Sequence, residues 1–402
     1  MDELLSNSID DNENNPHMLQ VLEALKQASH DLQHVHHHHS NSNSPSIKAL
    51  LELQTESDNI LSTDPNLSTL SQHLTRLKSL VDTLNRSNGH LSLRSFLTRR
   101  VSKHSISRVA GSIETEIQAW IHRESVETLA RTLRDPNHNP DELVTLLTQF
   151  GERVSHGFNR EFQDLVLKFK IFASLENILF DPKCCKRVRE HAGEAVAALI
   201  QFNKDVFVGQ VSMGPTIIAL MGMCTLHSIE VLCSLIRLIR SPFVDEIESN
   251  GEIPKIFALL NSNELQIRVL ALDCVLEIGY FGRKETVDAM MKEGLVKKLV
   301  ELQKSEVGGD LIELNNDEGE EREKEEEGGK GKRENKHKRF LEKHPFASCV
   351  ARFAVQLEIG EGLRQREKRA FKIEILTRVR EASVSDAEYA TIVAEILWGS
   401  SL

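Results

Sequence analysis

The stretch SNGEIPKIFALLNSNELQIRVLALDCVLEI, residues 249–278, carries more apolar surface than one pair of helices can bury. Its second half has an apolar face at helical spacing, which predicts a helix. That face consists of Ile267, Leu270, Ala271, Cys274, Val275 and Ile278. The opposite face of the same helix is also apolar and consists of Leu265, Val269, Leu272 and Leu276. A helix that is apolar on two sides has to be enclosed between neighbouring helices, as in a stack of repeats.

The sequence around this helix repeats at a fixed distance. Val244 recurs as Val287 and Gly251 as Gly294, in both cases 43 residues later. Periods of about 40 to 47 residues, built from two or three helices, indicate an α-solenoid. The apolar helix recurs upstream and downstream if the highly charged stretch 306–343 is taken as a disordered insertion. We therefore expect about five repeats over residues 140–402.

The three-helix unit NGEIPKIFALLNS followed by NELQIRVLALDCVLEIG strongly resembles the armadillo repeat. The resemblance implies that the third helix of each repeat lines a groove for an extended segment of a partner protein. On the third helices, a polar stripe between the two apolar faces predicts the residues of that groove. With their counterparts in the neighbouring repeats, these residues are Arg187, Glu194, Leu235, Ile239, Gln266, Asp273, Glu277, Arg352 and Gln356.

The N-terminal third has helical apolar spacing but no 40-residue period, which predicts a separate helical bundle over residues 17–135. Residues 1–16 are polar and expected to be disordered, and 34–45 form a His/Ser/Asn-rich linker. The segment 92–121 is similar to the helical N-terminal domain of plant U-box/armadillo and armadillo-repeat-only proteins. Residues 135–140 leave no room for a U-box, so the resemblance implies a plant armadillo-repeat superfamily protein without one. The expected fold is all-α, a bundle followed by an armadillo-like α-solenoid.

No catalytic motif stands out, which predicts a non-enzymatic protein with no small-molecule substrate, cofactor or metal. The histidine tract 34–39 could chelate zinc, but a low-complexity linker is the simpler interpretation. The six cysteines lack paired spacing, and no signal peptide or transmembrane segment is visible. The chain is therefore expected in the cytoplasm, the nucleus or both.

The charged insertion contains a basic run that suggests a nuclear-import signal or a phosphate-binding patch. Its bases are Lys330, Lys332, Arg333, Lys336, Lys338 and Arg339. The preceding acidic run makes a self-neutralised surface loop the alternative. A second cluster of five bases lies in 364–372, where a solvated helix face is the default interpretation. The net charge of −11 argues against general nucleic-acid binding.

These features favour a protein–protein interaction scaffold whose groove binds a partner segment. Reversing two charges, with Asp273→Arg and Arg352→Glu, is then expected to abolish binding without changing thermal stability. One alternative is an adaptor in a ubiquitin-ligase complex, acting through the N-terminal bundle. Another is a salt-sensitive nucleic-acid or anionic-membrane binder that uses the basic runs, which leaves peripheral membrane contact open.

Overall fold

The computed structural model describes residues 20–31, 67–87, 93–135, 139–309 and 340–398, which are helices joined by turns, with no strand among them. The expected all-α class is therefore confirmed for these residues. By its internal contacts the chain divides into two compact units. The first comprises Met1–Arg131 and Asn159–Lys170, and the second Thr132–Phe158 and Ile171–Leu402.

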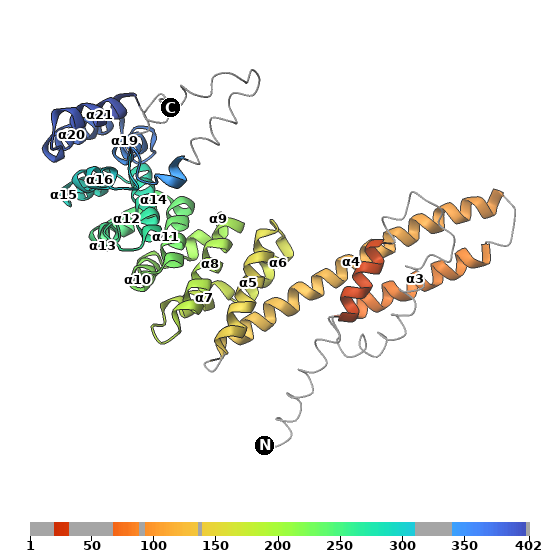
Figure 1. Cartoon of the computed structure of the whole chain (residues 1–402). Coiled ribbons are helices and arrows are strands. Elements are labelled where there is room, and N and C mark those ends of the chain that lie inside the picture. Colours follow the sequence, from red (N-terminus) through yellow and green to blue (C-terminus); the bar gives the residue numbers. More distant parts are fainter. Residues whose placement is uncertain (1–19, 32–66, 88–92, 136–138, 310–339, 399–402) are drawn as a thin grey trace, which may run out of the picture. The chain divides into compact units, whose positions relative to one another are not determined.

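The first unit is a helical bundle with its own apolar core. It contains a helix over residues 20–31, α3 (Ser68–Ser87), α4 (Leu93–Arg134) and α6 (Arg160–Lys168) (Figure 1). Leu22 from the first helix, Leu74 from α3 and Ile113 from α4 are buried together in one cluster. The ring of Phe162 in α6 meets His122 of α4 edge-on, with centroids 5.6 Å apart.

Three-helix repeats form the second unit. One repeat consists of α12 (Ser241–Ser249), α13 (Ile253–Leu259) and α14 (Leu265–Phe281). The next consists of α15 (Lys284–Lys292), α16 (Leu295–Gln303) and α19 (Cys349–Ile359). The first helices α12 and α15 begin 43 residues apart (284 − 241), as the sequence period predicts.

Two glycines lie in the turns between the first and second helices of these repeats. Gly251 has a φ of 68° and Gly294 a φ of 79°, which glycine adopts without the steric penalty of a Cβ atom. Pro254 lies in the first turn of α13, where its missing N–H removes no helical hydrogen bond.

Further helices extend the array on both sides of these repeats. The chain enters through α5 (Pro140–Ser155), α7 (Ile171–Phe180) and α8 (Lys186–Phe202). It continues through α9 (Lys204–Phe207), a 3₁₀ turn (Val208–Gln210), α10 (Met213–Met223) and α11 (Leu226–Ile239). After α19 the described residues end with α20 (Gln365–Ala382) and α21 (Asp386–Trp398).

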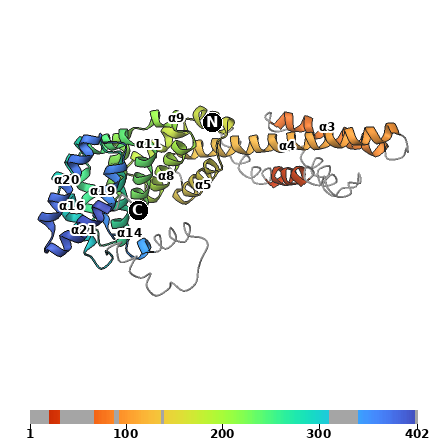
Figure 2. The ribbon, with the colours of Figure 1, turned by 90° about the horizontal axis from the view of Figure 1, so that it is seen from above.

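The third helices α8, α11, α14 and α19 pack one against the next, and α5 packs on α8 (Figures 1 and 2). We call α8, α11, α14 and α19 the third-helix row. Cys274, Val275 and Ile278 in α14 are fully buried between neighbours. Gly279 lies so close to α19 that an added Cβ atom would be 2.8 Å from the ring of Phe353. The stack of three-helix repeats makes this unit an armadillo-like α-solenoid.

Between α16 and α19, the residues before and after the segment 310–339 lie side by side. The backbone N–H of Phe346 donates to the carbonyl of Val307 at 3.3 Å, and that of Ser348 to the carbonyl of Gly309 at 2.9 Å. Nδ1 of His344 lies 3.0 Å from the carbonyl oxygen of Gly308. These contacts hold both ends of the expected insertion, while residues 310–339, including the basic run, lie outside the described residues.

No single helix in the described ranges is both long and apolar enough to cross a membrane. One pair, Lys204–Gln210 with Met213–Met223, reaches the required length and composition together, with an 80° bend at the break between them.

Candidate partner-binding groove

The exposed side of α14 carries the polar stripe that the sequence suggested. Gln266 is exposed, and Asp273 and Glu277 are partly exposed, whereas Ala271, Cys274 and Ile278 point into the array. Of the other predicted residues, Arg187 in α8 is exposed, and Glu194 in α8 and Arg352 and Gln356 in α19 are partly exposed. These seven predicted groove residues are therefore all at least partly accessible to solvent, on helices of the third-helix row.

The prediction of an apolar groove patch at Leu235 and Ile239 is wrong. Leu235 is fully buried and Ile239 is 3% exposed, so both pack inside the array. The error is a slip of one residue in the register between α11 and α14. Because each residue turns an α-helix by about 100°, a slip of one exchanges exposed and buried positions. The α11 residues that face solvent with Gln266 and Asp273 are His227 and Ser234.

Charged side chains on this side pair across adjacent helices. Arg187 Nη1 of α8 is 2.8 Å from Asp141 Oδ1 of α5, and Arg237 Nε of α11 donates to Glu277 Oε1 of α14 at 2.7 Å. His227 Nδ1 of α11 lies 3.9 Å from Glu194 Oε1 of α8. Asp273 of α14 interacts electrostatically with Arg352 of α19. We call these four pairs the charge ladder. It joins α5 to α8 and then each helix of the third-helix row to the next.

The last pair of the charge ladder is the least exposed to solvent. Burial raises the pKa of the Asp273 carboxyl, while the nearby guanidiniums of Arg352 and Arg237 act in the opposite direction. Burial lowers the pKa of Arg352, whose Nη1 donates to the carbonyl of Pro345 at 2.7 Å. Arg352 therefore supports the fold as well as facing the groove.

An apolar depression of about 530 Å³ opens at the N-terminal ends of α11 and α14. Its floor and walls are Leu226, Leu265, Val269, Leu270, Leu341 and Pro345. Glu230, Gln266, Glu342 and Arg352 complete the lining. Leu265 keeps 39% of its surface exposed, and Val269 and Leu270 are only partly buried. The two-sided burial expected for the helix therefore fails at its N-terminal end, because the neighbouring helices leave a hollow there.

Sequence reasoning missed Leu341 and Pro345, because Leu341 lies at the end of the charged stretch 306–343 and Pro345 follows it directly. They reach the depression only because the main-chain contacts of residues 307–309 return the chain beside its point of departure. A register one residue longer between α11 and α14 would have identified the exposed His227 and the partly exposed Ser234. The repeat pattern alone carried no signal for the depression.

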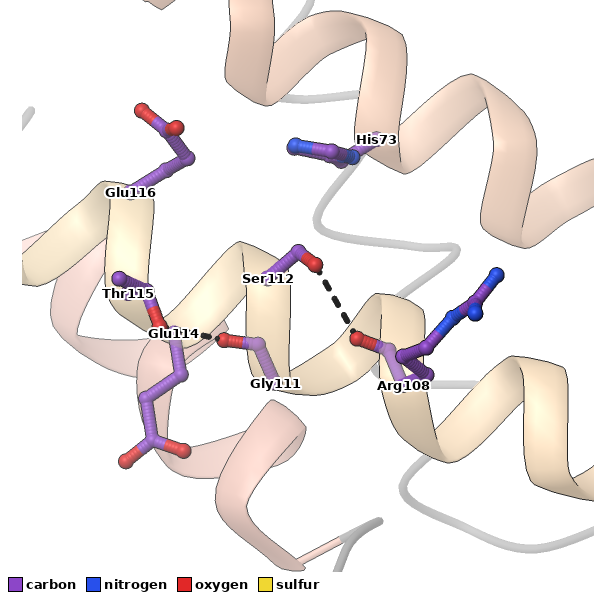
Figure 3. Close-up of a pocket in the computed structure, with 7 residues that line it drawn as sticks. All are labelled: His73, Arg108, Gly111, Ser112, Glu114, Thr115 and Glu116. Atoms are coloured by element: carbon purple, nitrogen blue, oxygen red, sulfur yellow. Dashed lines mark hydrogen bonds between the residues drawn. The ribbon is translucent and has the colours of Figure 1, made fainter.

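A second depression, of about 500 Å³, lies in the first unit between α3 and α4 (Figure 3). His73 of α3 and Arg108 of α4 line it together with Glu114 and Glu116. The hydroxyls on its α4 side donate to carbonyls of their own helix, as shown by Ser112 to Arg108 at 3.1 Å. The opposite charges and internally bonded hydroxyls give no convergent set of ligand groups.

Candidate metal ligands do not gather in the part of the chain that the structure covers. It holds no group of three or more His, Cys, Asp and Glu side chains arranged for an ion. The histidine tract 34–39 lies outside the described residues.

No family model and no curated protein matches the sequence. Among solved structures, the chain is similar to the designed armadillo repeat protein YIII(Dq)4CqI, with 13% identity and a TM-score of 0.42, over 67% of this chain and 98% of that one. It is also similar to designed armadillo repeat protein YIII(Dq.V1)4CPAF in complex with peptide (KR)4, with 13% identity and a TM-score of 0.39, over 67% and 98%. A third is Kap121p bound to Pho4p, with 10% identity and a TM-score of 0.38, over 87% of this chain and 35% of that one. The fold class itself rests on the helix packing described above.

Proposed function

We propose that this chain is a non-enzymatic scaffold that binds an extended segment of a partner protein along the third-helix row. The observation that carries the proposal is the depression beside the charge ladder, where Leu265, Val269 and Leu270 remain accessible to water. Apolar surface gathered in a hollow with a polar rim is typical of interaction sites. The ladder extends the surface over neighbouring repeats, as an elongated segment requires.

The experiment compares partners captured by the wild-type chain and by matched variants. Leu265→Asp with Val269→Asp places two charges in the depression, while Ile373→Asp with Val384→Asp changes two exposed apolar residues elsewhere. We expect the first variant to lose a defined set of proteins that the second retains, with both folded as judged by circular dichroism. If both variants capture the same proteins as the wild type, the depression is not the binding site.

The charge reversal suggested by the sequence is a poorer test. In that double variant Arg352→Glu removes the hydrogen bond to Pro345, and Asp273→Arg places a longer side chain at a partly buried position. Both effects destabilise the fold although the two positions keep opposite charges, because a backbone carbonyl loses its donor and the packing around position 273 has to adjust. The expectation of unchanged thermal stability is therefore withdrawn.

Not all five basic side chains of residues 364–372 are available to bind an anionic ligand. Lys368 Nζ donates to the carbonyls of Glu358 at 2.9 Å and Gly360 at 2.7 Å, so it caps the end of α19. Lys372 Nζ is 2.9 Å from Glu358 Oε2. Two of the five bases are thus used within the fold, which favours the scaffold over a phosphate or membrane binder. The ubiquitin-ligase adaptor role, the basic run 330–339 and the cytoplasmic or nuclear location stay predictions.

A further inference from the structure

The rim of the depression has an unbalanced charge. Glu230 and Glu342 both line it, and in the part of the chain that the structure describes neither forms an ion pair with a lysine or arginine. Glu230 Oε2 has His227 Nδ1 at 3.3 Å as its neighbour. The positive group at the rim, Arg352, already donates to Pro345 and interacts with Asp273. An incoming cationic side chain would therefore meet two carboxylates that, among the described residues, are not paired with a lysine or arginine.

The floor of the depression selects for apolar side chains. Leu226, Leu270 and Leu341 face it from three separate segments and leave a hollow of about 530 Å³. A hollow of this size lies within the range of about 300–1,000 Å³ that is typical of ligand sites, so it has room for several apolar side chains.

One polar side chain beside the floor can meet a peptide backbone. Gln266 is exposed at the edge of the hollow and offers an amide N–H₂ and a carbonyl oxygen together. A side chain with both functions can donate to and accept from the backbone of an extended segment.

We propose that the depression recognises a protein segment with bulky apolar side chains next to a lysine or arginine. The apolar side chains enter the hollow between α11 and α14, the backbone meets Gln266, and the basic side chain reaches Glu230 or Glu342. This inference rests on the proposed function and adds the chemistry of the partner. The carboxylates at the rim favour binding of a basic segment over an acidic one.

The test uses the full chain as bait for a library of displayed random peptides, followed by affinity measurements on the enriched peptides by fluorescence anisotropy. We expect enrichment of peptides that combine Leu, Ile or Phe with an adjacent Lys or Arg. Leu265→Ser should weaken these peptides about tenfold, because one large apolar contact is lost. Glu230→Lys should weaken them about three- to tenfold, as expected for reversal of a partly exposed pair.

Two matched variants serve as controls. Ile373→Ser changes an exposed apolar residue on α20, and Glu285→Lys an exposed carboxylate on α15. Neither should change the affinity by more than about twofold, because neither side chain lines the depression.

The outcomes separate this inference from the proposed function. Acidic peptides that depend on Leu265 but gain affinity with Glu230→Lys would overturn the inference and leave the proposed function standing. Enriched peptides unaffected by Leu265→Ser would overturn both. A selection that enriches no sequence above the starting library would overturn the inference, and partner capture would then decide on the proposed function alone.

Discussion

Truncating two leucines of the same helix tests whether α14 has the register described here. Leu272 is 1% exposed, whereas Leu270 is partly exposed at the depression. Leu272→Ala removes a side chain enclosed on all sides, and such truncations cost about 2–5 kcal/mol because a cavity is left behind. Leu270→Ala leaves no enclosed cavity and loses part of one apolar transfer term, about 1 kcal/mol.

The assay is thermal and urea unfolding of the full chain, followed by its helical circular dichroism signal. For a domain of this size about 1 kcal/mol corresponds to roughly 2–4 °C, so Leu272→Ala should lower the Tm by roughly 4–20 °C. Leu270→Ala should lower it by only about 2–4 °C. Because repeat arrays need not unfold in two states, midpoints are compared only between variants with equal urea slopes. Equal losses, or a larger loss for Leu270→Ala, would refute the register.

Four further perturbations probe other parts of the array. A double-mutant cycle should give Arg237 and Glu277 a coupling energy of about 0.3–1 kcal/mol, because Arg237 is largely exposed. A coupling energy of zero would show that this pair does not contribute to the charge ladder. Gly279→Val should lower the Tm because its Cβ would be 2.8 Å from a ring of the next third helix; an unchanged Tm would contradict that close approach. Burial raises the pKa of Cys349 to about 12 from 9.0, so the neutral thiol is favoured in the fold. The stabilisation that comes from the neutral thiol is present below pH 9 and is lost as the pH rises toward 12. Over that interval the free energy of unfolding should therefore fall less for Cys349→Ala than for the wild type. Parallel curves for the two proteins would contradict this prediction. Replacing residues 310–339 with a short Gly/Ser linker should leave the Tm unchanged or slightly higher, because main-chain hydrogen bonds already hold the flanking ends and shorter loops lose less entropy on closure; a large loss would show that those ends need the segment.

The sequence contained enough to predict the repeat architecture. The two apolar faces of residues 265–278 required neighbours on both sides, and the 43-residue recurrence of Val244 and Gly251 identified those neighbours as further copies. Burial of Cys274 and Val275 confirms that reasoning for the middle of the helix.

The groove was only partly predictable, because a repeat pattern fixes a helix face but not the contacts between helices. The stripe at Gln266, Asp273 and Glu277 followed from helical periodicity alone. The α11 stripe depended on an alignment with weak similarity, and a slip of one residue placed Leu235 at the surface. The pairing of Arg237 with Glu277 joins residues 40 positions apart and requires the packing of two helices to be known.

Hydrogen exchange of the full chain, with and without a peptide bound, tests the central claim most directly. Binding at the third-helix row should slow amide exchange around residues 226–230, 265–270 and 341–345, where the depression is formed. Protection confined to the second helices α10, α13 and α16, or to the first unit, would show that partners bind elsewhere and would contradict the account.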